Sequence, residues 1–182
     1  MWKGMTGVLL AAIAAAGGGT LYAQSESSAV RPEGAALRAL IARGMERSAT
    51  CRDLVTRLDK ADVIVYVKFS RCGPGVAACL VWASVAGQPR RLLIKLDRFG
   101  RSPDELTTLL AHELQHANEV ASAPEVTDLA SFRTSFASRG WTHGDGFETE
   151  QAREITRRVA AELNRAEHHP DFERRPQSTA RE

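Results

Sequence analysis

The stretch SPDELTTLLAHELQHANEV, residues 102–120, decides the fold of this 182-residue chain. Ser102 is a residue type that caps helices, a proline follows at the first helical position, and Glu105 stands where a capping box places its carboxylate. Leucine, alanine and valine then recur at helical spacing as far as Val120. Because apolar residues occur on more than one side, the pattern predicts a long helix that is buried around much of its circumference.

Inside this helix lies the sequence His-Glu-x-x-His, formed by His112, Glu113 and His116. Two histidines four residues apart lie on one face of a helix, so both imidazoles can reach the same zinc ion. Glu113 is rotated by about 100° from His112, which places its carboxylate beside the metal rather than on it. There it can take a proton from zinc-activated water and pass it to a leaving amine. The spacing therefore predicts a zinc site with Glu113 as general base.

A third metal ligand is needed, because catalytic zinc sites usually have three protein ligands and one open position. The segment directly after His116 supplies no further histidine, so the ligand is expected further along the chain. Glu148 is the preferred candidate, since it opens the last predicted helix directly after a glycine-rich loop. Glu150 is the runner-up. Glu119, one turn beyond His116, is expected to support a ligand or to face solvent.

The pattern on either side of the central helix alternates between helix-like and strand-like segments. Helices are expected at 33–47, from 50 to about 58, at 127–136 and at 147–167, with a loop at 139–146. Strands are expected at 63–69, 78–86 and 91–97, joined by short links that favour an antiparallel meander. The sequence therefore predicts an α+β fold with N-terminal helices, a three-stranded antiparallel sheet, the His-Glu-x-x-His helix and a C-terminal helix.

The first 23 residues have the order of a secretory signal. Lys3 precedes an apolar run at 8–16, three glycines break that run, and Ala23 offers a small residue for cleavage. The run is too short for a membrane span, which needs about 20 apolar residues. We therefore expect an exported protein, periplasmic or extracellular, with no span after cleavage. A polar linker at 24–32, a single domain at 33–168 and a disordered tail at 169–182 are expected to follow.

Composition and cysteine content narrow the class of protein. The chain is 43% hydrophobic and 25% charged, as folded proteins usually are, and its formal net charge of +2 does not favour nucleic acid as a partner. Three cysteines are too few for a disulfide-dense scaffold. Export permits one disulfide, but Cys51, Cys72 and Cys79 allow three pairings and the sequence does not choose among them.

Two motifs carry a resemblance to a known family. AHELQHA at 111–117, followed by GFETEQA at 146–152, resembles the zincin superfamily, specifically its small gluzincin-type metallopeptidases and a group of secreted bacterial proteins. This resemblance implies a zincin-like fold with zinc held by His112, His116 and Glu148. It also implies a sheet edge beside the active-site helix that pairs with an extended peptide substrate. The strand that runs from Arg91 to Asp97 is the natural candidate for that edge.

These features predict a secreted zinc metallopeptidase that acts on a peptide or protein substrate. His143, in the glycine-rich loop, is a candidate donor to the developing oxyanion, and Tyr66 is a weaker one. Two alternatives stay open: a zinc-stabilised binding domain without turnover, and a zinc hydrolase of a non-peptide bond. Glu113 favours an enzyme, because a structural zinc site needs no base and usually has four protein ligands.

Overall fold

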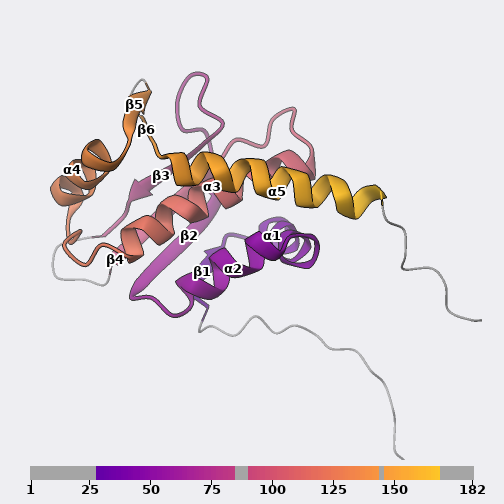
Figure 1. Ribbon diagram of the computed structural model, residues 1–182, viewed down its shortest axis with the longest axis horizontal. Helices are drawn as coiled ribbons and strands as arrows, with labels where there is room; N and C mark the ends of the chain where they lie inside the picture. The colour runs from indigo at the N-terminus through magenta and orange to yellow at the C-terminus, as the bar shows by residue number, and fades with distance from the viewer. Residues whose placement is uncertain (1–27, 85–89, 144–145, 169–182) are drawn as a thin grey trace, which may run out of the picture.

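The computed structural model describes residues 28–84, 90–143 and 146–168 (Figure 1). The predicted signal and tail therefore lie outside the described residues. None of the described helices combines the length and the apolar character that a membrane span needs. In chain order the elements are β1 Val30–Pro32, α1 Ala35–Arg47, α2 Ala49–Leu58, β2 Val63–Phe69, β3 Ala78–Trp82, β4 Arg90–Leu96, α3 Pro103–Ala121, α4 Leu129–Arg139, β5 Trp141–His143, β6 Gly146–Glu148 and α5 Glu150–His168.

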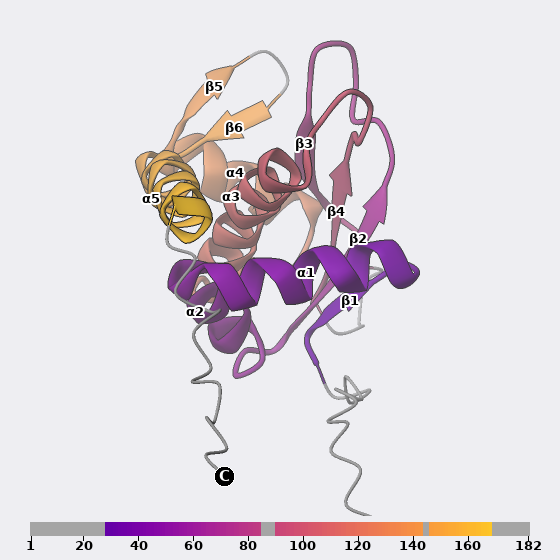
Figure 2. The same cartoon turned by 90° about the vertical axis from the view of Figure 1, so that its right-hand side faces the viewer.

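The main sheet is mixed and four-stranded, with the order β1-β2-β4-β3. Strands β1, β2 and β4 are parallel to one another, and β3 runs antiparallel to β4 (Figure 2). The predicted three-stranded antiparallel sheet is therefore wrong. The fourth strand, β1, comes from the end of the segment that we expected to be a polar linker, where Val30 is buried and pairs with Val65.

Burial explains why β4, rather than β3, takes the place beside β2. Leu92, Ile94 and Leu96 in β4 are fully buried, whereas every residue of β3 is only partly buried. The more apolar strand gains more from an interior position, so β3 folds back along the outer side of β4. The prediction that the strand from Arg91 to Asp97 forms the substrate-binding edge is consequently wrong. The edge strand that contacts α3 is β3.

Helix α3 is fixed at both ends. At its start, Ser102 and Glu105 form the predicted capping box. At its end, the buried guanidinium of Arg90 donates to the carbonyls of Val120 and Ala123, both at 2.9 Å, and forms an ion pair with Asp62. Because the last carbonyls of a helix lack partners within the helix, Arg90 supplies the donors that they need. The helix that carries the predicted zinc motif is thus held rigidly against the sheet.

The C-terminal part of the chain adds a hairpin and a long helix. The segment predicted as a loop, 139–146, contains β5 and the first residue of β6, which pair antiparallel. The helix predicted from residue 147 begins at Glu150 instead, because Phe147 and Glu148 pair with β5, and α5 then packs along α3 (Figure 1). Glycine is required at Gly140, because a Cβ there would lie 2.0 Å from the carbonyl oxygen of Glu148. At the other end of α5, the Glu162 carboxylate accepts hydrogen bonds from Ser48 and Thr50, which anchors α5 to the start of α2.

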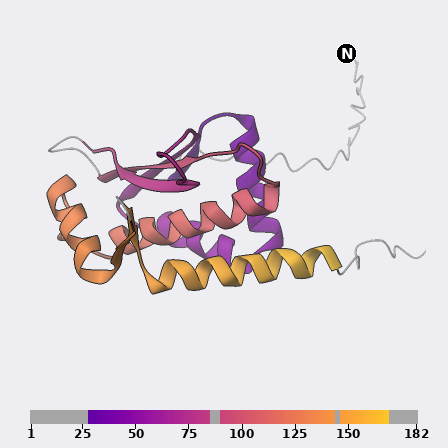
Figure 3. The same cartoon turned by 90° about the horizontal axis from the view of Figure 1, so that it is seen from above.

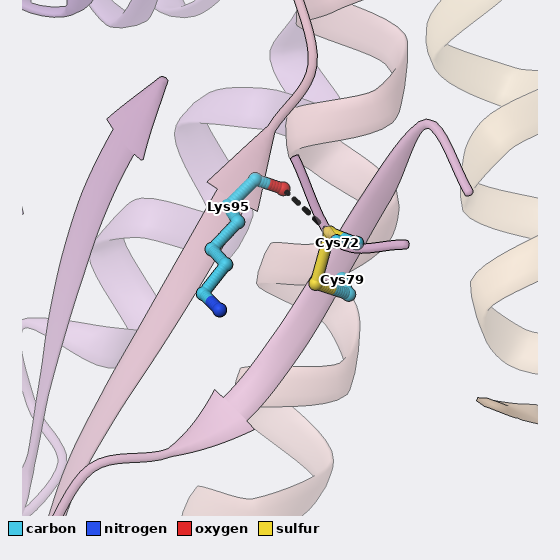
Figure 4. Close-up of a disulfide and its surroundings, with 3 residues drawn as sticks. All are labelled: Cys72, Cys79 and Lys95. Carbon is cyan, nitrogen blue, oxygen red and sulfur yellow. Dashed lines mark hydrogen bonds between the residues drawn. A yellow bond between two sulfur atoms is a disulfide. The ribbon is translucent and has the colours of Figure 1, made fainter. Parts of the chain in front are cut away.

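The three cysteines have different fates. Cys72 and Cys79 form a disulfide that closes the loop between β2 and β3 (Figure 4). The sulfur of Cys72 lies 3.7 Å from the carbonyl oxygen of Lys95, so the loop also contacts β4. Cys51 is a buried free thiol whose pKa is raised, chiefly by burial. It is therefore an unreactive core residue.

Candidate metal centre

Two imidazoles of α3 point at one place. The Nε2 atoms of His112 and His116 are 3.2 Å apart, as expected for histidines one helical turn apart. His116 is buried, with 4% of its surface exposed, and His112 is half-buried. Two imidazole nitrogens on one tetrahedral zinc ion, each at 2.0–2.1 Å from it, would be about 3.3 Å apart. The observed separation therefore fits a shared metal ion.

The other nitrogen of each ring has a hydrogen-bond partner that orients it. His116 Nδ1 lies 3.0 Å from Glu119 Oε2, and the acceptor-only carboxylate requires that Nδ1 carry a proton. His112 Nδ1 lies 2.9 Å from the hydroxyl of Thr156, which itself donates to the carbonyl of Ala152 and so accepts from the ring. In both neutral rings, the Nε2 lone pair is thus directed at the same space.

The Nε2 lone pairs of the two neutral rings repel each other, so a positive charge between them is stabilising. Burial and, to a smaller extent, the neighbouring His116 together lower the pKa of His112 to about 4, so His112 is neutral near pH 7. Burial also lowers the pKa of His116, but the hydrogen bond to Glu119 and nearby carboxylates outweigh it and raise that pKa. A proton on His116 or a metal ion between the rings therefore satisfies both nitrogens.

Glu148 reaches this space from β6, in the β5–β6 hairpin. Its Oε1 lies 3.6 Å from His112 Nε2, and one ligand atom from each of His112, His116 and Glu148 lies within 4.8 Å of the others. The backbone N–H of Thr149 donates to the same Oε1 at 3.0 Å and orients the carboxylate. Glu150 lies elsewhere: it is exposed, and its carboxylate contacts Arg157 at 2.9 Å and Arg153 at 3.7 Å. The fold thus brings Glu148, and not Glu150, to the histidines.

Glu113 lies beside the histidines in a nearly dry environment. Only 5% of its surface is exposed, and its pKa is raised to about 7, chiefly by burial. The charge of Glu148 contributes to this rise, whereas His116 and a hydrogen bond from the backbone amide of Leu80 oppose it. Since Leu80 belongs to β3, the carboxylate of Glu113 connects α3 to the edge strand of the sheet.

Glu119 is a buried junction rather than a surface residue. Its Oε2 binds His116, and its Oε1 accepts from the hydroxyl of Thr149 at 2.8 Å and from Gln115 at 3.2 Å. Thr149 in turn accepts from the amide of Ala152 in the first turn of α5. The residue that orients His116 therefore also fixes the point where β6 passes into α5, directly beside Glu148.

An aromatic row borders the site on the side of α4. The centroid of the Phe136 ring lies 5.3 Å from that of His116, 5.0 Å from that of Phe132 and 6.0 Å from that of Phe147. Phe132 continues the row to Trp82 at the end of β3, at 5.8 Å. These rings exclude water from one side of His116 and join α4 to the edge strand.

Sequence reasoning missed several of these residues. Thr156 and Ala152 lie one turn apart on α5, and nothing in their spacing marks them as partners of a histidine. The phenylalanines of α4 were predicted only as part of a short helix. Tyr66 is not brought to the site, because it lies on the face of β2 that points away from α3. His143 lies in β5, but its side chain is outside the described part of the structure.

Comparison with known proteins adds no relative. Searches against protein-family models, the curated proteins and the solved structures gave no match to this chain. The resemblance to small gluzincin-type peptidases therefore stays a prediction, and a functional assignment depends on the geometry of the site.

Proposed function

We propose that this protein is a zinc-dependent metallopeptidase. The observation that carries the proposal is the convergence of His112, His116 and Glu148 on one space, with a second, buried carboxylate beside it on Glu113. Three protein ligands leave one position open for water or substrate, as in catalytic zinc sites. A zinc ion held there supplies a Lewis acid that polarises a carbonyl group and acidifies water.

The remaining chemistry belongs to side chains of this chain. Glu113 accepts a proton from a water molecule and delivers it to the leaving amine. The amide of Leu80 holds the Glu113 carboxylate in place, and the dry surroundings keep the pKa of Glu113 near 7, where it can both take and give a proton. Glu119 and Thr156 hold the two imidazoles in the tautomer that a metal ion needs.

The edge of β3 offers a place for an extended substrate. Ala83 N–H donates to the carbonyl of Arg91, and Asp97 N–H donates to the carbonyl of Ala77, so the odd-numbered residues along this strand direct their backbone groups toward β4. The alternate residues Ala78 and Trp82 therefore direct their backbone groups toward the edge, and between them the amide of Leu80 already donates to Glu113. A peptide paired there would run past Glu113, and the aromatic row that starts at Trp82 would contact one of its apolar side chains.

The test is a peptide-library digest read by mass spectrometry, with wild type beside Glu113→Gln. We expect Glu113→Gln to keep about one zinc per chain and to cleave about 100-fold or more slowly, because general bases contribute factors of this size. Glu150→Gln serves as the matched control and should cleave like wild type, since its carboxylate lies outside the site. Equal background from wild type and Glu113→Gln would favour the zinc-stabilised binding domain instead.

A further inference from the structure

The two faces of the main sheet have different surroundings. On one face, Val65, Leu92 and Ile94 are fully buried beneath the helices, and α3 and α5 lie on this same side (Figure 3). On the other face, the outward side chains are exposed or only partly buried. Parallel strands are normally covered on both faces. Within the described residues no helix covers this second face of the three parallel strands, which suggests that something binds there.

The uncovered face is cationic with an apolar centre. Its outward side chains, assigned from the strand registers, are those of Arg31, Ile64, Tyr66, Lys68, Cys79, Val81, Arg91, Leu93 and Lys95. Four of them are cationic and none is a carboxylate. Lys68 and Lys95 are direct partners on neighbouring strands, an arrangement that like charges disfavour. Among the described residues, neither lysine has a carboxylate partner.

A pocket of about 310 Å³ lies on this face, at the β1 side of the sheet. Tyr66, which is 37% exposed, and Leu93 give it apolar walls, and the cationic side chains of Arg31 and Lys68 border it. The single acidic group at its rim is Glu33, just beyond β1. The pocket can therefore hold one apolar side chain whose neighbours are negatively charged.

We propose that this face, defined by Tyr66, Leu93, Lys68, Lys95 and Arg31, docks an acidic polypeptide segment. One apolar side chain of the segment occupies the pocket, and its carboxylates lie against the cations. A membrane surface fits less well, because Tyr66 and Leu93 line a pocket that receives a side chain, whereas a membrane-binding surface inserts its own apolar side chains into the lipid. A nucleic acid fits less well, because one tyrosine cannot stack successive bases.

This docking face is separate from the candidate metal centre. It lies on the side of the sheet opposite α3, so a segment bound there leaves the space between His112 and His116 accessible. An acidic region of a substrate or of a partner protein can thus be held while another segment reaches the edge of β3. The proposal does not depend on turnover, because it is tested by binding alone.

The experiment is selection of a random displayed peptide library on the full chain. We expect selected peptides to be rich in Asp and Glu around one Leu, Phe or Met. The best peptide should bind Lys68→Glu/Lys95→Glu at least about tenfold more weakly, because charge reversal replaces attraction by repulsion. Arg57→Glu/Lys60→Glu, at exposed positions at the end of α2 and in the turn after it, changes the net charge equally and should bind normally. Leu93→Ser should weaken binding of the apolar residue selectively.

Measurements of folding and of metal content show whether a variant loses peptide binding because it is misfolded or because the docking face is altered. Lys68→Ala/Lys95→Ala serves as a second variant, and both pairs should keep the circular dichroism spectrum and zinc content of wild type. A library without binders, selected peptides without an acidic excess, or equal binding to the lysine variants and wild type would overturn the docking face. Glu113→Gln should bind the peptides like wild type, so loss of peptidase activity leaves this proposal standing.

Discussion

His112 and His116 are brought together by one helix, whereas Glu148 reaches them from a hairpin. The alignment of the two histidines depends on local geometry: a capping box starts α3, and a spacing of four residues aligns the rings. The hairpin half depends on contacts between distant segments, namely Glu119 with Thr149 and His112 with Thr156. The helix alone therefore aligns the two histidines, whereas Glu148 reaches them only when α5 is docked.

This difference indicates how the site can fail. A substitution in α3 removes a ligand but leaves the frame of the molecule in place. A substitution around β6 or α5 moves a ligand without removing it, so metal affinity falls by degrees. Loss of the ligand on α3 should thus have the largest effect, and loss of remote anchors of α5 the smallest.

The largest effect is expected from His116→Ala. It removes a ligand and leaves the buried Glu119 without its imidazole partner. If three protein ligands and water share a zinc-binding free energy of about 10–16 kcal/mol, one ligand is worth about 2.5–4 kcal/mol. Because Glu119 also loses its partner, we expect the upper end of this range, a fall in affinity that approaches a thousandfold. Competition with a chromophoric chelator measures this loss. An unchanged zinc affinity would show that α3 does not hold the metal.

The helical half could be predicted from sequence, whereas for the hairpin half the sequence indicated Glu148 but not the strand that carries it. His112, Glu113 and His116 are close because helical periodicity fixes the spacing of neighbours. The position of Glu148 depends on the β5–β6 hairpin. Its strands are only three residues long and lie in a glycine-rich segment, so the sequence pattern does not predict them. The sheet was mispredicted for the same reason. The sequence shows three strand-like segments but not that β3 crosses to the far side of β4, since strand order is set by competition for burial.

The next largest effect is expected from Glu148→Ala compared with Glu150→Ala. Glu148 lies 3.6 Å from His112 Nε2, so its removal should weaken zinc binding by about a hundredfold. Glu150 pairs with Arg157 on the exposed face of α5, so its removal should leave zinc affinity unchanged. Both variants should unfold at similar denaturant concentrations. The reverse order of affinities would make Glu150 the ligand and would reject the observed hairpin geometry.

A smaller effect is expected where the partners of the imidazoles are removed. Glu119→Ala deletes a carboxylate that holds both His116 and Thr149, and should weaken zinc binding about 10- to 100-fold. Thr156→Val deletes only a neutral hydrogen bond to His112, and should cost less than Glu119→Ala. Glu119→Gln, which keeps an acceptor for the imidazole, should lie between Glu119→Ala and wild type. Equal losses for Glu119→Ala and Thr156→Val would mean that the junction at Glu119 adds nothing beyond orienting one ring.

The smallest effect is expected at the far anchor of α5. Burial alone raises the pKa of Glu162, but hydrogen bonds from Ser48 and Thr50 outweigh it and leave the pKa below its usual value. A lowered pKa in the folded state stabilises the protein above the ordinary glutamate pKa of about 4.3, and this contribution is lost as the pH falls through the folded-state value. Glu162→Gln should therefore lower the free energy of unfolding by about 1 kcal/mol at pH 7, and the difference from wild type should shrink in acid. Urea unfolding at pH 7 and at pH 3 measures both values, with Glu154→Gln, on the exposed face of α5, as control.

The same substitution tests how far the anchor of α5 affects the metal centre. Because α5 carries Thr156 and follows Glu148, zinc affinity at pH 7 should fall slightly in Glu162→Gln. A loss as large as that of Glu148→Ala would show that the two halves of the site are not separable.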